Sequence, residues 1–233
     1  MGASDEIAKL TVPERIEAAK AKTEKVVDHL RYLIKLHENN VLILSPLLRS
    51  QIPTSHAGNA FIVFQHGVFQ FEIVRLCALW DGIDLDKENV PTIIAFINQS
   101  DVVDALVEES CSPWPDPRDK GYRAKIAQKA RAGLHKAIRD ARKIESSKTL
   151  KSIMNLRHKH LAHSLTQTRD EKAGPIPPMK YGDQRVILNK TLPIVQALHL
   201  WINGADFSFN KSRKIDRKNA KALWEGCKFT IEY

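Results

Sequence analysis

The segment LRHKHLAHS crowds five side chains suited to phosphate chemistry into seven positions. They are Arg157, His158, Lys159, His160 and His163. A histidine with an ordinary pKa of about 6.5 can take or give a proton at neutral pH. An arginine stays charged and offers a planar fork to the oxygens of a phosphate. The segment therefore holds groups that can move protons and bind charge around a phosphodiester.

The spacing of these residues limits which of them can act together. Arg157 and His163 are six residues apart, so on one α-helix they lie about 9 Å apart along the axis and about 120° apart around it. Lys159 shares a face with His163, whereas Arg157 shares another face with His160. A two-fold contact between identical helices brings Arg157 of one chain near His163 of the other. The spacing therefore favours a site shared by two copies of the chain.

Two simpler interpretations of the segment stay open. A helix C-terminus favours each nearby cation by about 0.3–1 kcal/mol, which explains one or two of these residues but not the whole pattern. His160 and His163 could also share a zinc ion. However, no carboxylate lies between Glu145 and Asp170, and the neighbouring cations repel a metal ion.

Charge is unevenly spread along the 233 residues, whose net charge is +9. Residues 1–112 hold ten Lys and Arg against 16 Asp and Glu, whereas residues 113–233 hold 26 against 11. A basic half attracts polyanions and gives salt-dependent binding. The alternative is an ordinary solvated basic surface.

Several other classes of protein are disfavoured. The apolar runs are short, as at Val41–Leu44, so we expect no membrane span, and the N-terminus has no apolar core of a signal peptide. Cys77, Cys111 and Cys227 show no CxxC spacing, which argues against a disulfide framework or zinc knuckle and favours a reducing cytoplasm. No P-loop or dinucleotide fingerprint occurs, and no cofactor is expected.

Apolar residues recur at three and four positions, which predicts an all-α chain folded as an antiparallel helical bundle. We expect helices over Pro13 to about His37 with Thr11 as the cap, Ser55–Gly82, one or two short stretches between Val90 and Ser110, Tyr122 to about Ser146, a helix through the motif capped by Ser146 or Thr149, Leu192–Gly204 and Ile215–Cys227. The helix over Ser55–Gly82 is apolar nearly all round, so we expect it at the centre of the bundle.

The remaining segments are expected to connect these helices. Three prolines within Cys111–Gly121 indicate an extended linker, and Thr166–Arg185, rich in Gly and Pro, is expected to be a loop. We predict one bundle over residues 1–205, with a basic C-terminal helix and tail over residues 206–233 packed on the same domain. The helix over Tyr122–Ser146 is either an RNA-backbone tract or a solvated face, and its candidate RNA contacts are Arg131, Arg139, Arg142 and Lys143.

The segment LRHKHLAHS resembles the R-x4–6-H signature of the HEPN superfamily, in which a polar residue follows the arginine. Here five residues separate Arg157 from His163, and His158 stands where Asn is commoner. The Lys two positions after the arginine and the closing Ala-His-Ser are similar to the family related to the AbiU abortive phage infection proteins. A second segment, FEIVRLCALWD, resembles the apolar helix ending in a large residue and Asp that such proteins carry ahead of the motif.

The resemblance implies a helical bundle that dimerises through its motif helices and cuts RNA without a metal ion. In that role His163 would be the general acid or base, Arg157 would stabilise charge, and His158 would orient groups or donate to phosphate. Lys159 and His160 are weaker candidates for contacts with the RNA backbone. The product would carry a 2′,3′-cyclic phosphate, because the 2′-OH of RNA is the nucleophile.

The leading hypothesis is therefore a homodimeric endoribonuclease of phage defence or of a toxin–antitoxin pair. A cognate antitoxin or a nucleotidyltransferase is a candidate partner that no residue here identifies. The main rival is a non-catalytic module in which the same residues bind RNA, a nucleotide or a protein. A purely structural dimerisation domain is the third hypothesis.

Overall fold

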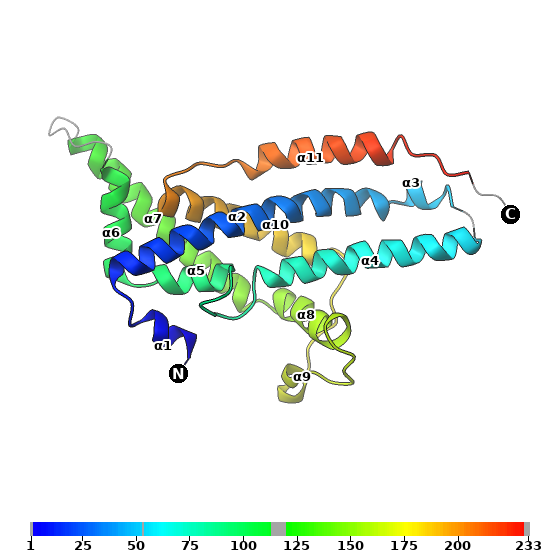
Figure 1. Ribbon diagram of the computed structural model, residues 1–233, viewed down its shortest axis with the longest axis horizontal. Coiled ribbons are helices and arrows are strands. Elements are labelled where there is room, and N and C mark those ends of the chain that lie inside the picture. Colours follow the sequence, from blue (N-terminus) through cyan, green and yellow to red (C-terminus); the bar gives the residue numbers. More distant parts are fainter. Residues whose placement is uncertain (1, 53, 113–119, 231–233) are drawn as a thin grey trace.

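The computed structural model describes residues 2–52, 54–112 and 120–230, and within these ranges the chain is all α, as predicted. Its elements are α1 (Ala3–Ile7), α2 (Val12–Ile43), α3 (Pro46–Arg49), α4 (His56–Ala78), α5 (Val90–Ile97), α6 (Ser100–Cys111), α7 (Lys120–Glu145), α8 (Lys148–Leu156), the π-helical turn η2 (Arg157–Leu161), α9 (Arg169–Ala173), α10 (Asp183–Asn203) and α11 (Phe209–Trp224). Figure 1 shows α2, α4 and α11 running side by side along the long axis, with α8 and α9 on one flank. Most of the linker predicted over Cys111–Gly121 lies outside the described residues.

The long helix α2 is the element around which the others pack, since α4, α5, α6, α10 and α11 all contact it. It begins after Thr11, whose backbone N–H donates to the Glu14 carboxylate at 2.8 Å, as the predicted cap requires. It ends at Ile43, beyond the end predicted near His37. Asn40 does not stop the helix, because it is buried and donates instead to the carbonyl oxygen of Val68 at 3.1 Å and to Glu72 at 2.6 Å.

The prediction that α4 lies at the centre of the bundle is wrong. Its only fully buried residues are Gln65, Glu72, Ile73, Leu76 and Cys77, and Val63 is 73% exposed. The two polar residues face α2, where Gln65 Nε2 donates to the carbonyl oxygen of Ile43 at 2.7 Å. Because the side of α4 that faces α2 is fixed by hydrogen bonds, many of its apolar residues are left facing solvent.

α4 is also the one described helix that is long and apolar enough to cross a membrane, by length and composition alone. The expectation of no membrane span rests on the shortness of the uninterrupted apolar runs, a measure that overlooks this helix. Only 28% of its most apolar stretch is buried. Isolated Gln, His and Gly residues interrupt its apolar runs without adding charge.

The starts of two further helices and one cap also differ from the predictions. α10 begins at Asp183, not Leu192, and continues through Pro193. α11 begins at Phe209 after the cap Ser208, because Phe209 is a core residue at 1% exposure. α8 is capped by Ser147, whose hydroxyl accepts from the N–H of Leu150 at 3.2 Å, and not by Ser146 or Thr149.

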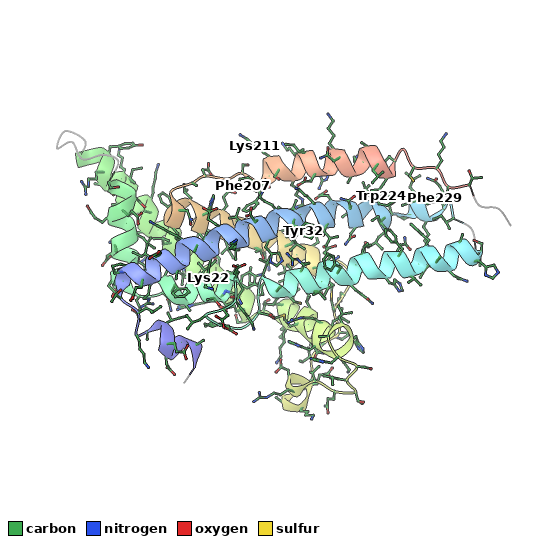
Figure 2. The ribbon with its side chains drawn as sticks, viewed as in Figure 1. Lys22, Tyr32, Phe207, Lys211, Trp224 and Phe229 are labelled. Atoms are coloured by element: carbon green, nitrogen blue, oxygen red, sulfur yellow. The ribbon has the colours of Figure 1, made fainter. Side chains whose placement is uncertain are left out.

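α11 is fixed to α2 by a buried carboxylate. Glu38 is 1% exposed and accepts hydrogen bonds from Arg213 at 2.5 Å and Arg217 at 2.7 Å. Burial raises the pKa of Glu38, but the bonds and charges of the two arginines outweigh burial and lower it. Trp224, which Figure 2 shows between α11 and α2, donates to the side chain of Asn39 at 2.8 Å.

Gly133→Ala should destabilise the protein, although alanine is the better helix former. A Cβ at position 133 would lie 2.1 Å from Nε1 of Trp201, so the α7–α10 contact would have to open, at a cost of about 1–3 kcal/mol. Thermal unfolding should show a lower melting temperature. Gly121→Ala, in the same helix with open space around the added atom, is the control and should show no loss.

Candidate functional site

Arg157, His158, Lys159 and His160 lie on a π-helical turn, and not on a regular α-helix, whereas His163 lies just beyond the end of that turn. η2 spans Arg157–Leu161, and the N–H of Ala162 donates to the carbonyl oxygen of Arg157, five residues earlier, at 2.8 Å. Just beyond it the N–H of Leu165 donates to the carbonyl oxygen of Lys159 at 3.0 Å. Turns of this kind are frequent at functional sites. They also change the angle between successive side chains, so the regular α-helical geometry that places Arg157 and His163 about 120° apart does not apply here.

Arg157 is turned toward the end of α4. Its Nη1 donates to Oδ1 of Asp81 at 2.6 Å, and the two side chains are 23% and 18% exposed. The other carboxylate oxygen of Asp81 lies 3.9 Å from the ammonium of Lys87. Asp81 therefore holds the guanidinium in one position while leaving part of it open to solvent.

The backbone ahead of Asp81 is firmly held. Trp80 is buried, and its indole N–H donates to the hydroxyl of Thr191 in α10 at 3.0 Å. The carbonyl oxygen of the buried Leu79 accepts from the N–H of Val90 at 2.9 Å. These contacts fix where α4 ends, and with it the carboxylate that meets Arg157.

Cys77 lies beside this ion pair but is unsuited to act as a nucleophile. It is fully buried, and burial raises the pKa of its thiol to about 12, although the positive charge of Arg157 acts in the opposite direction. The thiol therefore stays protonated at neutral pH. Its position makes it part of the packing under Arg157.

The three motif histidines, His158, His160 and His163, are all exposed. Two cavities of about 240 and 430 Å³ lie elsewhere, and no motif residue lines either of them. The larger lies between α6, α7 and α10. In a single chain the motif is thus an exposed surface, with Arg157 held at its base and the imidazoles free to meet a ligand or a second chain.

The loop after the motif is tied back to it through Glu171. One carboxylate oxygen of Glu171 accepts from Asn155 at 2.9 Å and Lys159 at 3.0 Å, and the other accepts from the backbone N–H of Thr168 at 2.9 Å. The hydroxyl of Thr168 donates to Oδ1 of Asn155 at 2.6 Å. Lys159 is therefore engaged within the chain, and the predicted loop over Thr166–Arg185 contains the short helix α9.

The four basic candidates on α7 fall into two pairs. Arg131 lies 2.5 Å from Asp104, and Lys143 lies 3.5 Å from Asp140, so both are partly neutralised. Arg139 and Arg142 are exposed and form no ion pair within residues 2–52, 54–112 and 120–230. Of the four candidates, these two are the most available to a polyanion.

No metal site accompanies the motif in the part of the chain that the structure describes. Among those residues no group of three or more His, Cys, Asp or Glu side chains is arranged to hold a metal ion. The zinc interpretation of His160 and His163 would need a carboxylate or another ligand from outside the described residues.

Sequence reasoning identified the motif but missed the residues that hold it. Asp81 stands in the segment FEIVRLCALWD, which supported the family resemblance, but neither its position beside the motif nor its ion pair with Arg157 was predicted. Thr168 and Glu171 form a T-x-x-E capping box, a sequence signal that marks a helix start inside the supposed loop. The bonds of Glu171 to Asn155 and Lys159 depend on how the loop folds back.

The comparisons identify a family. The model of the AbiU2 family of HEPN domains matches residues 16–223, which run from the start of α2 to the end of α11. No curated protein and no solved structure is detectably similar to the chain.

Glu171→Gln should loosen the loop in a pH-dependent way. Bonds from Asn155, the Thr168 backbone and Lys159 lower the pKa of Glu171 from 4.5 to about 2. Its stabilisation is therefore complete above pH 4.5 and is lost as the pH falls toward 2. The melting temperature of the variant should lie below that of the wild type at pH 7, and the gap should narrow below pH 4.5. Glu88→Gln, at an exposed position, should show no such gap.

Proposed function

Because the chain belongs to the AbiU2 family of HEPN domains, we propose that it is a metal-independent endoribonuclease that acts as a homodimer. Its role would be phage defence, or that of the toxin in a toxin–antitoxin pair. The observation that carries the proposal is one exposed segment, η2 and the residues just after it, that presents three imidazoles close in sequence to a guanidinium fixed by Asp81.

The proposed reaction uses the groups of the RNA and of this turn. The 2′-oxygen attacks the adjacent phosphorus while a histidine takes its proton, and the 5′-oxygen of the next nucleotide leaves with a proton from an acid. His163 fills one of these proton-transfer roles, and His158 orients the phosphate or donates to it. Arg157 stabilises the negative charge that builds on the non-bridging oxygens. The products are a 2′,3′-cyclic phosphate and a 5′-hydroxyl.

The ion pair with Asp81 gives Arg157 a defined position before RNA binds. A guanidinium has five N–H donors, and Asp81 is bonded through Nη1, so other donors stay available to a phosphate. Holding the group in place lowers the entropy lost on binding. Asp81 is in this proposal a positioning residue, because it acts through Arg157.

A second candidate function follows from the same ion pair. Asp81 neutralises part of the charge of Arg157, which suits a module that binds RNA, a nucleotide or a protein without cutting it. The two functions differ in one observable: the module retains RNA and leaves its phosphodiester bonds intact.

Purified protein incubated with total RNA in EDTA should produce fragments ending in 2′,3′-cyclic phosphate. His163→Ala should lower the cleavage rate by about 10²–10⁴-fold, the usual loss for a general acid or base. Arg157→Ala should also abolish most cleavage, because the developing charge loses its stabiliser. Fragment ends mapped by cyclic-phosphate-dependent ligation provide the measurement.

The matched control is His56→Ala, which removes an exposed histidine at the start of α4. It should cleave at the wild-type rate. RNA that is bound but never cut by the wild-type protein would favour the non-catalytic module. Cleavage that needs a divalent ion, or that survives His163→Ala unchanged, would contradict the mechanism.

The α7 cations should contribute unequally to RNA affinity. Arg139→Ala and Arg142→Ala should each weaken binding to all RNA sequences alike and reduce the slope of log affinity against log salt by about 1. Arg131→Ala should have a smaller effect, because Asp104 already pairs with it. Filter binding over a salt series measures the affinity for RNA and its dependence on salt. Equal slopes for the wild type and all three variants would show that these three arginines do not contact the RNA backbone.

A further inference from the structure

Tyr181, in the turn just before α10, is an aromatic side chain that the proposed mechanism does not use. It is 77% exposed, more than any other large hydrophobic side chain among the residues that the structure describes. Its ring stacks on that of Phe69 in α4, with the ring centroids 6.1 Å apart and the planes at 28° to each other. A side chain this exposed has one face of its ring covered at most. The other face is therefore open to a planar ligand.

The turn holds Tyr181 in a fixed place. The backbone N–H of Lys180 donates to Oδ2 of Asp183 at 2.8 Å, and that of Gly182 donates to Oε1 of the buried Gln184 at 3.1 Å. Gly182 adopts the left-handed region, with a φ of 98°, which residues with a side chain rarely take. A ring presented from such a turn loses little conformational entropy when a ligand stacks on it.

Phe69 places this ring on the side of α4 that faces the motif. Phe69, Ile73 and Cys77 follow one another at steps of four, so they lie along one stripe of the helix. Cys77 lies beside Arg157, and α4 contacts both α8 and η2. Along the α4 axis Phe69 is about 12 Å from Cys77, a distance that a few nucleotides of an extended strand can span. Figure 1 shows the segment between α9 and α10 passing from the flank of α8 toward α4.

The groups around Tyr181 suit an anionic chain. Lys180 and Arg185 are close to it in sequence on either side and are both exposed, and neither forms an ion pair in the described part of the chain. The nearest carboxylate in sequence, that of Asp183, already accepts the backbone N–H of Lys180. Exposed aromatic rings among cations are typical of surfaces that bind single-stranded nucleic acid, where bases stack on the rings and phosphates meet the cations.

A purely structural role explains the stacked pair less well. The contact with Phe69 is not needed to hold the turn, because the hydrogen bonds to Asp183 and Gln184 already do so. Aromatic rings that pack in the core of this chain, such as Phe96 and Phe209, are only 1% exposed.

We propose that Tyr181 forms a nucleobase-binding subsite, in which one base of the RNA stacks on the open face of its ring while Lys180 and Arg185 meet the adjoining phosphates. Every base has a π face, so the subsite adds affinity without reading sequence. A base inside a duplex is already stacked on both sides, so the subsite takes an unpaired nucleotide. In its choice of RNA as the ligand the proposal rests on the proposed function, although stacking requires no cleavage.

The test measures binding of the full chain to two probes of equal charge, by filter binding. One is a single-stranded RNA of about 12 nucleotides, and the other is the same ribose-phosphate chain without bases. Both carry 2′-O-methyl groups, so that neither can be cut. The wild type should prefer the probe with bases. Tyr181→Ala should weaken binding to that probe by about 5- to 100-fold and leave binding to the abasic probe unchanged.

Two further variants show whether the ring is what matters. Tyr181→Phe keeps the ring and should bind both probes as the wild type does. Tyr32→Ala removes a tyrosine that is 47% exposed and whose ring lies 6.4 Å from that of Phe71, another phenylalanine of α4. Tyr32 belongs to α2, as Figure 2 shows, and Phe71 lies on the opposite side of α4 from Phe69. This variant should bind both probes as the wild type does.

The salt dependence separates stacking from a fault in folding. A base that stacks releases no counterion, so the slope of log affinity against log salt should be the same for Tyr181→Ala and the wild type. A collapsed turn would displace Lys180 and Arg185 as well and would reduce the slope. The proposal is overturned by that reduced slope, by a wild type that binds both probes equally, or by Tyr181→Phe binding as weakly as Tyr181→Ala.

The outcome is independent of the nuclease test. RNA cleavage that needs His163, in a protein whose RNA affinity is the same with Tyr181→Ala, removes the subsite and keeps the ribonuclease. A protein that never cuts RNA, yet loses its preference for the probe with bases in Tyr181→Ala, keeps the subsite and removes the ribonuclease.

Discussion

The buried carboxylate of Glu72 is the constraint that sets the arrangement of this molecule. A carboxylate at 1% exposure is tolerated only where hydrogen-bond donors meet it, and His37 and Asn40 of α2 provide those contacts. α4 can therefore face α2 in only one rotation. An apolar helix with no such residue would turn its most hydrophobic side inward. Here the polar groups fix the rotation of α4 about its axis. Its apolar residues are buried only where that rotation turns them inward.

The same constraint reaches the functional turn through the end of α4. With the helix fixed, Trp80 reaches Thr191 in α10, and the next residue, Asp81, points its carboxylate to Arg157. The buried Cys77 and Ile73 fill the space beneath. The position of one guanidinium thus depends on contacts spread over three helices. This explains why a segment far from LRHKHLAHS in the sequence is needed to describe the site.

Much of the fold could be predicted from periodicity and caps, whereas the relations between elements could not. Thr11 caps its helix as expected, Ser55 caps α4 at the start predicted for that helix, and Leu198 and Ile202 of α10 are buried. The burial of α4 was predicted wrongly, because its hydropathy is high on every side and two polar residues determine which side packs. The pairing of Arg157 with Asp81 joins residues 76 positions apart, a contact that local pattern cannot supply. Regular helix geometry also failed at the motif itself, where the backbone takes a wider turn.

That wider turn has a consequence for how the motif tolerates change in length. A π-helical turn accommodates one residue more than the α-helix it interrupts, so a single insertion or deletion can be absorbed there without shifting α8. At Arg157–Leu161 a change in the length of the motif would therefore alter the local winding of the backbone and leave the packed helix before it in place.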